Sequence, residues 1–427
     1  MGIPSELTRR AWLRLIAAGS AALTVGCGDN LPSVDAASAV LEPTEAGFIL
    51  AVWARHAREA TVTLRVDGQL AMHRLLLGEG GSGMLAFREL LPATEYELII
   101  RTADDILLGP HHIRTAPRAD DPRPVRIAVA ADLDPNPAFA SDLVEHVIAA
   151  APDLLVTLGD FPYTDNGPPA HSLAEYRERH AELRTLPRVR ALLEAVPVRA
   201  IYDDHEFRNN WDAAFVATEA ERYAAAMTVW DEFFPLREPG SAADEVRYRS
   251  WRWGAHVECF LLDCRRFRSA NAAPDDDRKS MLGETQRAWL TAGLRASTAT
   301  FKLVFTSVPL DIARELDTWT GFQTERDALF EAVVGIPGLL FVSGDQHYFA
   351  VNRHAFGIRE VQIGPLARGL GAIPVAGPGR LFVAQRFNVG LIEIDGDRLV
   401  IAGLGEGGER FYEESLSPAD LTARRPG

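Results

Sequence analysis

The sequence predicts an α/β fold with mixed β-sheets, preceded by a small all-β domain. From residue 125 onward, short apolar runs alternate with segments of helical periodicity, which is typical of βαβ units. Before residue 116, short strand-like runs are separated mainly by Gly, Pro and Asp, a pattern that favours a β-sandwich. Several of the later apolar runs also end in aspartate, which places titratable groups at one edge of a predicted sheet.

Length and charge limit the classes of function. A chain of 427 residues with 47% hydrophobic content can form two or three domains with a sizeable core. The formal net charge of −15 argues against binding to nucleic-acid polymers or to anionic membranes in general. An anionic substrate would therefore need a local cluster of cations or a metal site.

Residues 1–28 are predicted to be a targeting segment. "TRRAWLR" at residues 8–14 resembles a twin-arginine export signal, and the apolar run Leu15–Val25 is too short to span a membrane. "LTVGC" resembles a lipoprotein cleavage box with Cys27 as the lipidated residue, although Thr24 stands where a larger aliphatic residue is usual. We expect export by the twin-arginine machinery to the periplasm or outer cell surface, with Cys27 as a possible lipid anchor and a plain cleaved signal as the alternative.

The other two cysteines are not expected to form a disulfide. Cys259 and Cys264 are expected to lie in one strand, at an odd spacing that sends their side chains to opposite faces.

Residues 29–120 are predicted to form the amino-terminal β-sandwich and a linker. Residues 29–38 are predicted to be a short polar tether, and residues 40–115 are predicted to form strands. "APRADDPRP" at residues 116–124 is predicted to be the linker. "LLPATEYELIIRT" at residues 90–102 resembles the late strands of a fibronectin type III or immunoglobulin-like module, with Tyr96 in the place of its tyrosine corner. A packing or positioning role is expected for this domain.

Residues 121–427 are predicted to form the second domain. Apolar runs and helical periodicity alternate along it. The expected strands are Val125–Ala130, Leu154–Leu158, Val198–Tyr202, His256–Asp263, Phe301–Thr306 and Leu339–Val342. The expected helices are Pro137–Ala150, Ser172–Ala195, Thr218–Phe234, Gly283–Leu294 and Thr324–Val334. Antiparallel strands are expected at Val361–Ile363, Phe382–Val389 and Leu391–Leu404, with a turn at Asp395–Asp397.

Acidic residues at the ends of these strands carry the candidate chemistry. A single strand-end aspartate is often only a helix cap, and a single histidine is often structural. Here several acids recur together with two histidines, which indicates a site for two metal ions. The residues concerned are Asp132, Asp160, Asp203, Asp204, Asp263 and Asp345, with His205 and His347.

The motifs "GDFPYTD", "YDDHEFRNN", "LLDCRRFR", "MLGETQRAWL", "FKLVFTSVPL" and "FVSGDQHY", in this order, resemble the PhoD-like alkaline phosphatases of the calcineurin-like metallophosphoesterase superfamily. The resemblance covers residues 125 to about 389. It implies a four-layer sandwich of helices around two mixed β-sheets.

The resemblance also implies a set of metal ligands. Asp160 would bridge both ions, Tyr163 would bind a trivalent ion, and Asp204 would bind the second ion, with an amide ligand from Asn209 or Asn210. Asp345 and His347 match the final acid and imidazole ligands. The expected pair, by resemblance, is Fe³⁺ with Ca²⁺.

Two residues would act on the substrate rather than on the metals. His205 would lie beside the leaving oxygen, and Arg265 resembles the arginine that meets the substrate phosphate, with Asn210 as a further substrate contact.

Two departures from the family pattern affect this reading. Asp132 stands where the family often has cysteine; as an oxygen ligand it would favour harder ions, and Asp134 could add a further ligand. Ser307 stands where many metallophosphoesterases have a histidine ligand, a departure that PhoD-like members share.

The favoured hypothesis is an exported phosphatase that cleaves phosphomonoesters, phosphodiesters or both with a metal-activated hydroxide. One alternative is a catalytically impaired lipoprotein that binds metal or phosphate at the cell surface. Another is a phospholipase D-like or nucleotide-cleaving phosphodiesterase at the same site.

Overall fold

The computed structural model describes residues 34–134, 141–236, 246–311, 315–375 and 379–425. The targeting segment, with its twin arginines and Cys27, lies outside these residues. Within them, no helix has the length and apolar character needed to cross a membrane.

A nine-stranded mixed sheet forms the centre of the molecule. Its strand order is β20-β19-β18-β8-β9-β10-β1-β2-β5, and β8, β9 and β10 run parallel. The bounds are β1 (Ala36–Thr44), β2 (Gly47–Ala54), β5 (Ser82–Phe87), β8 (Val125–Ala130), β9 (Leu154–Thr157), β10 (Val198–Ala200), β18 (Asn388–Asp395), β19 (Arg398–Gly405) and β20 (Arg410–Leu416).

A seven-stranded sheet faces the first one. Its order is β11-β12-β13-β14-β16-β15-β17, with β12, β13, β14 and β16 parallel. The bounds are β11 (Arg249–Trp253), β12 (Val257–Leu261), β13 (Phe301–Thr306), β14 (Leu339–Ser343), β15 (Phe349–Arg353), β16 (Arg359–Gln362) and β17 (Arg380–Ala384). Residues of both sheets share one apolar core, so the two sheets pack face to face.

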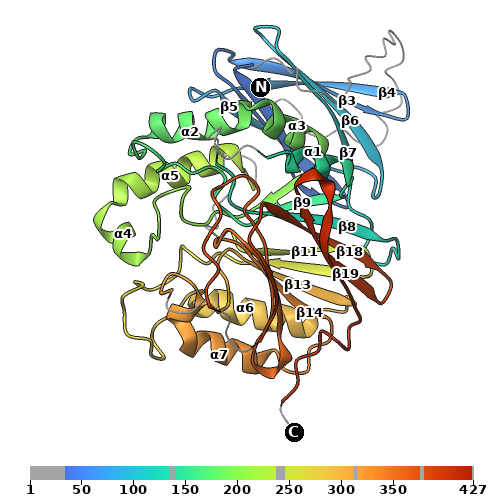
Figure 1. Ribbon diagram of the computed structural model, residues 1–427. Coiled ribbons are helices and arrows are strands. Elements are labelled where there is room, and N and C mark those ends of the chain that lie inside the picture. The colour runs from blue at the N-terminus through green and yellow to red at the C-terminus, as the bar shows by residue number, and fades with distance from the viewer. Residues whose placement is uncertain (1–33, 135–140, 237–245, 312–314, 376–378, 426–427) are drawn as a thin grey trace.

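Helices cover the outer faces of this pair of sheets (Figure 1). One core joins the nine-stranded sheet to α1 (Leu143–Ala149), α2 (Leu173–Thr185), α3 (Pro187–Ala195), α4 (Ala213–Thr218) and α5 (Ala220–Phe233). Another joins the seven-stranded sheet to α6 (Gly283–Ala296), α7 (Gln323–Ala332) and the 3₁₀ turn Trp319–Phe322. Two shorter 3₁₀ turns are Ala355–Gly357 and Glu406–Gly408. The layers are therefore helices, sheet, sheet and helices.

The amino-terminal strands enclose a separate core between a four-stranded sheet and one end of the nine-stranded sheet. A four-stranded sheet of order β4-β3-β6-β7 packs against β1, β2 and β5. Its bounds are β3 (Glu59–Val66), β4 (Gln69–Leu76), β6 (Glu95–Thr102) and β7 (Leu107–Arg114). The hydroxyl of Tyr96 accepts a hydrogen bond from the Leu91 N–H at 2.9 Å, as a tyrosine corner does. The likeness to a fibronectin module stays a prediction.

The amino-terminal strands are nevertheless continuous with the rest of the protein. β1 pairs in parallel with β10, with Leu41 opposite Val198. Glu42, which follows in β1, forms ion pairs with Arg199 of β10 and with Arg249 of β11. The sheets therefore do not divide at residue 120, where the sequence predicts a boundary.

Two predicted elements are each divided in the structure. The helix expected over Ser172–Ala195 is interrupted at Leu186, which has an extended ψ of 129° because Pro187 follows it and begins α3. The strand expected over Phe382–Val389 is β17 of one sheet and the start of β18 of the other. The predicted hairpin after it is confirmed, with Asp395 opposite Arg398.

Three strands were not predicted: β11, β15 and β20. β11 and β20 carry charged residues among their apolar ones, which obscures a simple alternation. The prediction that Cys259 and Cys264 do not pair is confirmed, since both are free and buried, and Cys264 lies beyond the end of β12.

Candidate metal centre

The candidate centre lies where strands of both central sheets end. Loops after β8, β9 and β10 carry Asp132, Asp160 and the pair Asp203 and Asp204, while the loop after β14 carries Asp345. The carboxyl ends of parallel strands are the usual position of ligand sites in α/β sheets. The sheet packing therefore brings together acids that are up to 213 residues apart in the chain.

The loops that carry these acids are tightly constrained. Asp132, Asp160 and Asp345 have positive φ values of 62°, 58° and 75°, a conformation that aspartate adopts more readily than most residues. Gly159 has φ 104°, and a Cβ there would lie 2.4 Å from the backbone of Asp203. Only glycine fits at this position, and its absence of a side chain lets the loops after β9 and β10 approach each other.

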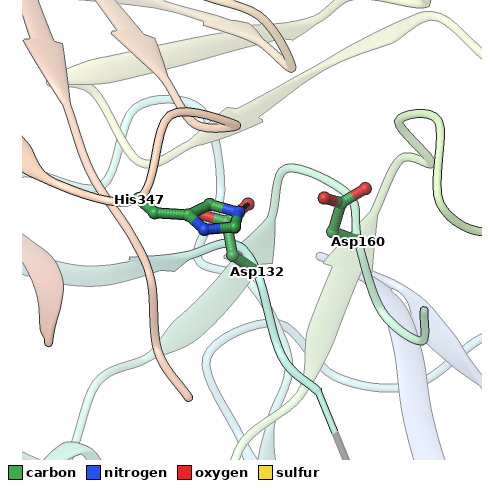
Figure 2. Close-up of side chains that lie close together, drawn as sticks. All are labelled: Asp132, Asp160 and His347. Atoms are coloured by element: carbon green, nitrogen blue, oxygen red, sulfur yellow. Dashed lines mark ion pairs between the residues drawn. The ribbon is translucent and has the colours of Figure 1, made fainter. Parts of the chain in front are cut away.

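The side chains form three overlapping groups, each with ligand atoms within 4.8 Å of one another. Figure 2 shows the first, in which Asp132, Asp160 and His347 come from three separate loops. The second group is Asp160, Asp204 and His205, and the third is Asp203, Asp204 and Asp345. Asp160 and Asp204 each belong to two groups, so the carboxylates are continuous from one group to the next.

Several carboxylate oxygens in these groups have no hydrogen-bond partner within the described part of the chain. They are both oxygens of Asp132, Oδ2 of Asp160 and Oδ1 of Asp204. All three residues are about 1% exposed. Burial, together with the negative charges of neighbouring aspartates, raises the pKa of Asp132 and of Asp160 well above the usual value. Uncompensated buried carboxylates of this kind need a cation.

His347 is oriented as a ligand. Its Nδ1 lies 2.7 Å from the carbonyl oxygen of Gly369, so Nδ1 carries the proton and Nε2 keeps its lone pair. Burial, together with the cation of Arg368, lowers the pKa of His347 to about 4, which keeps the ring neutral. Nε2 lies 2.9 Å from the hydroxyl of Tyr163 and 4.0 Å from Oδ1 of Asp132. Tyr163 therefore lies beside the first group.

Asp204 and His205 do not diverge as the sequence predicts, because the second group brings a ligand atom of each within 4.8 Å of the other. Burial raises the pKa of Asp204, but the cations of Arg265 and His205 outweigh it and hold the pKa below the usual value. His205 places Nδ1 2.6 Å from Oδ1 of Asp165. Burial lowers the pKa of His205, but Asp204 and Asp165 outweigh it and raise the pKa to about 9. The imidazole is therefore a proton donor at neutral pH.

Arg265 lies beneath the site and does not reach its surface. It is 0% exposed, and its guanidinium donates two hydrogen bonds to Asp203 at 2.7 and 2.8 Å and two to Asp317 at 2.8 and 2.7 Å. Oδ2 of Asp204 is 3.6 Å away. In this arrangement Arg265 contacts the carboxylates and not the space above them, so the predicted contact with substrate phosphate is not formed by this geometry.

The structure separates the two asparagines. The side-chain amide of Asn210 lies beside Asp204 and Asp317, and with its nitrogen turned toward them it donates to both, at 3.2 and 3.3 Å. Asn209 is exposed and contributes its backbone N–H to Asp165 at 2.7 Å. Of the two asparagines between which the sequence does not decide, Asn210 is thus the one whose side chain contacts the carboxylates. Asp134 pairs with Arg368, and Asp263 accepts from the hydroxyl of Tyr202.

Sequence reasoning missed Asp165, Asp317 and Arg368. Asp165 follows Asp160 within the same motif and could have been suspected from its position. Glu206 is buried, accepts the N–H groups of Phe161 and Asp203 at 2.8 and 3.0 Å, and fixes the two loops. Asp317 and Arg368 lie in segments without a recognisable motif, so their roles depend on tertiary packing.

The residues present fit a metal centre. Unpartnered buried carboxylate oxygens, a neutral imidazole with an available nitrogen and a buried phenol are a donor set for hard or borderline cations. Asp132 belongs to the first group and contributes a carboxylate to it.

Comparison with known proteins agrees with this picture. The sequence model of the PhoD-like phosphatase family matches residues 137–365, and the chain belongs to this family. Alkaline phosphatase D of Bacillus subtilis (strain 168) is 25% identical over 255 residues, which are 49% of this chain and 44% of the Bacillus protein. The match therefore spans less than half the length of that relative.

Two solved structures have the same fold. A structure of PhoD superposes with a TM-score of 0.78 at 17% identity, covering 92% of this chain and 90% of that one. The purple acid phosphatase PPD1 of yellow lupin (Lupinus luteus) gives a TM-score of 0.65 at 13% identity, covering 91% and 76%. The mixed α/β multi-sheet fold is thus that of PhoD and of purple acid phosphatase.

Proposed function

We propose that this chain is an exported metal-dependent phosphatase that hydrolyses phosphomonoesters, phosphodiesters or both. The observation that carries the proposal is the set of buried carboxylate oxygens without partners around Asp132, Asp160 and Asp204, beside a ligand-ready His347. Cations bound there would supply the positive charge that lowers the pKa of an attacking water and offsets charge on phosphate oxygens.

Two groups of ligands are proposed. Asp132, Asp160, Tyr163 and His347 would hold one ion, and Asp160, Asp204 and Asp345 would hold the second, while the amide nitrogen of Asn210 would orient Asp204. The proposed pair remains Fe³⁺ with Ca²⁺, and the oxygen donor of Asp132 favours hard ions at the first position.

The protein's own proton chemistry centres on His205. Asp165 holds Nδ1, so Nε2 is the nitrogen left to donate a proton to the leaving oxygen of a substrate. Arg265 acts as a positioning residue, because its guanidinium fixes Asp203 and draws Asp204 into its ligand orientation.

The test combines metal analysis with the variant His205→Ala. The purified protein should contain about two metal ions and hydrolyse phosphate esters, and a chelator should abolish the hydrolysis. His205→Ala should keep its metal content and lose roughly 10²- to 10⁴-fold in rate on an alkyl phosphate, with a smaller loss on an activated aryl phosphate.

Two outcomes would contradict these assignments. If the metal-loaded wild type hydrolysed no ester, the phosphatase proposal would be wrong, and the alternative of a metal- or phosphate-binding protein would be favoured. Metal loss in His205→Ala, or an equal loss on both esters, would remove the proton-donor role and assign His205 to metal binding or structure.

Export is the remaining part of the proposal. It is supported by the twin-arginine motif at Arg9 and Arg10 and by the lipoprotein-like position of Cys27. Fractionation of the native host tests it: wild type should appear outside the cytoplasm, and Cys27→Ser should leave the membrane fraction if Cys27 carries a lipid.

A further inference from the structure

An arginine outside every predicted motif lies against the first metal group. Arg368 follows β16, and its guanidinium carbon lies 4.5 Å from the centre of the Tyr163 ring. It forms an ion pair with Asp134, and the next residue, Gly369, accepts the hydrogen bond from Nδ1 of His347. Arg368 thus contacts one residue of the proposed centre, Tyr163, and is adjacent in sequence to the residue that orients another, His347.

The loop that carries Arg368 is fixed to the loop that carries Asp132. The N–H of Leu366 donates to the carbonyl of Ala131 at 2.9 Å, and that of Ala367 donates to the carbonyl of Asp132 at 3.2 Å. A Cβ on Gly364 would lie 2.2 Å from Oδ2 of Asp132, so glycine is required for this approach. The position of Arg368 is therefore set by the same contacts that set Asp132.

Arg368 has the access that Arg265 lacks. The side chain of Arg368 is 24% exposed and covers Asp134, which is 2% exposed. Arg265 is fully buried with both edges of its guanidinium on carboxylates. A planar guanidinium can keep one carboxylate partner and still present N–H groups to phosphate oxygens.

We propose that Arg368 binds the substrate phosphate and favours phosphomonoesters over phosphodiesters, an inference that rests on the proposed phosphatase function. A monoester at neutral to alkaline pH has two negative charges and three non-bridging oxygens, whereas a diester has one charge and two. An added cation at the edge of a strongly acidic site therefore stabilises the bound monoester more.

The competing interpretation is that Arg368 only neutralises Asp134. That role concerns the folded protein alone, so its loss would lower stability and slow both kinds of ester equally. The ratio of kcat/KM between the two esters separates the interpretations.

The experiment compares Arg368→Gln and Arg368→Lys with wild type on p-nitrophenyl phosphate and bis(p-nitrophenyl) phosphate, which share a leaving group. Arg386→Gln is the matched control, because Arg386 also lies over an aromatic ring, 4.6 Å from the centre of Phe411, and pairs with an acid, Glu409. Metal content and melting temperature are measured for each variant.

Arg368→Gln should lower kcat/KM for the monoester about 10- to 100-fold more than for the diester. Arg368→Lys should recover part of the ratio, and Arg386→Gln should leave it unchanged. An unchanged ratio in Arg368→Gln, whatever its melting temperature, overturns the proposal.

Binding of inorganic phosphate gives a second readout that does not need turnover. The metal-loaded Arg368→Gln protein should bind phosphate about 10-fold or more weakly than wild type in calorimetry. If wild type hydrolyses neither ester, the phosphatase proposal fails while this measurement still decides the role of Arg368. Equal phosphate affinity in the two proteins rejects that role.

Discussion

Two neighbouring clusters of buried aspartates differ in how their charge is balanced. Asp203 and Asp317 are held by Arg265, and Asp317 also by Arg268, so each carboxylate has a cation from the chain itself. Asp132 and Asp160 lie on the other side of Asp204 and have oxygens without any partner in the described structure. The chain supplies its own cations where it fixes the loops and leaves carboxylate oxygens without a partner at the proposed metal centre.

Asp160→Asn changes the cluster of Asp132 and Asp160, whose oxygens have no partner in the described structure, and gives the largest expected effect. We expect activity to fall at least about 10³-fold, because loss of the shared carboxylate removes charge that both ions need. In the presence of a chelator the same variant should be more stable than wild type, since it removes a carboxyl whose ionised form is disfavoured by burial and by the charges of Asp204 and Asp132. Rate assays and urea unfolding with and without metal measure both effects.

Asp317→Asn is the matched control for that variant. It removes a carboxylate that is already paired, and it should lower stability with or without metal. If the two variants changed the stability of the metal-free protein in the same direction, the contrast between the clusters would be wrong.

Arg265→Gln should disrupt the cluster in which Arg265 pairs with Asp203 and Asp317. It leaves Asp203 and Asp317 buried without their shared cation, and removal of one partner from a buried ion pair costs about 3–5 kcal/mol. The free energy of unfolding from urea titration measures it. If the Arg265→Gln protein kept its stability but lost phosphate binding, this result would contradict the positioning role. It would support the contact with substrate phosphate that the sequence predicts for Arg265.

His111 gives a third way for a titratable side chain to be buried. Within the described structure it forms no ion pair, and it does not belong to the candidate metal groups. It is 0% exposed, its Nε2 lies 2.8 Å from Oγ of Ser38, and burial lowers its pKa to about 4. In the unfolded chain the His111 side chain has a pKa near 6.5. Between that pH and about pH 4 it therefore binds a proton in the unfolded chain that it does not bind in the folded chain. Stability should therefore fall as the pH is lowered from about 6.5 to about 4, by roughly 3 kcal/mol from this residue.

The variant His111→Gln isolates this contribution. Its unfolding free energy, compared with that of wild type at pH 7.5 and at pH 4.5, should depend less on pH. A difference between the two proteins that is the same at both pH values would show that His111 does not titrate on unfolding.

The sequence was most informative where a predicted strand is followed directly by an acidic or histidine side chain. Asp160, Asp204, Asp345 and His347 follow apolar runs, and the structure brings them together because the ends of those strands meet. Arg265 was found by its motif, yet its burial depends on Asp317, which lies 52 residues away in a segment without periodicity. Arg368 was missed for the same reason, since only the contact between two strand-end loops places it at the site.

Domain organisation was less predictable than the site. The apolar alternation of residues 40–115 correctly indicates strands, but pairing between β1 and β10 is a long-range contact that no local pattern reveals. The split at Pro187 could have been read from the proline alone, whereas the change of sheet between β17 and β18 could not.

The position of Glu42 has a consequence for dissecting this protein into fragments. Glu42 is the counter-ion of Arg199, which is buried in β10, and of Arg249 at the edge of the other sheet. A fragment starting at residue 121 would therefore carry a buried guanidinium without its carboxylate and would expose β10 as an unpaired edge strand. The amino-terminal strands thus cover one side of β10 in the nine-stranded sheet, so the natural unit for expression and crystallography includes both regions.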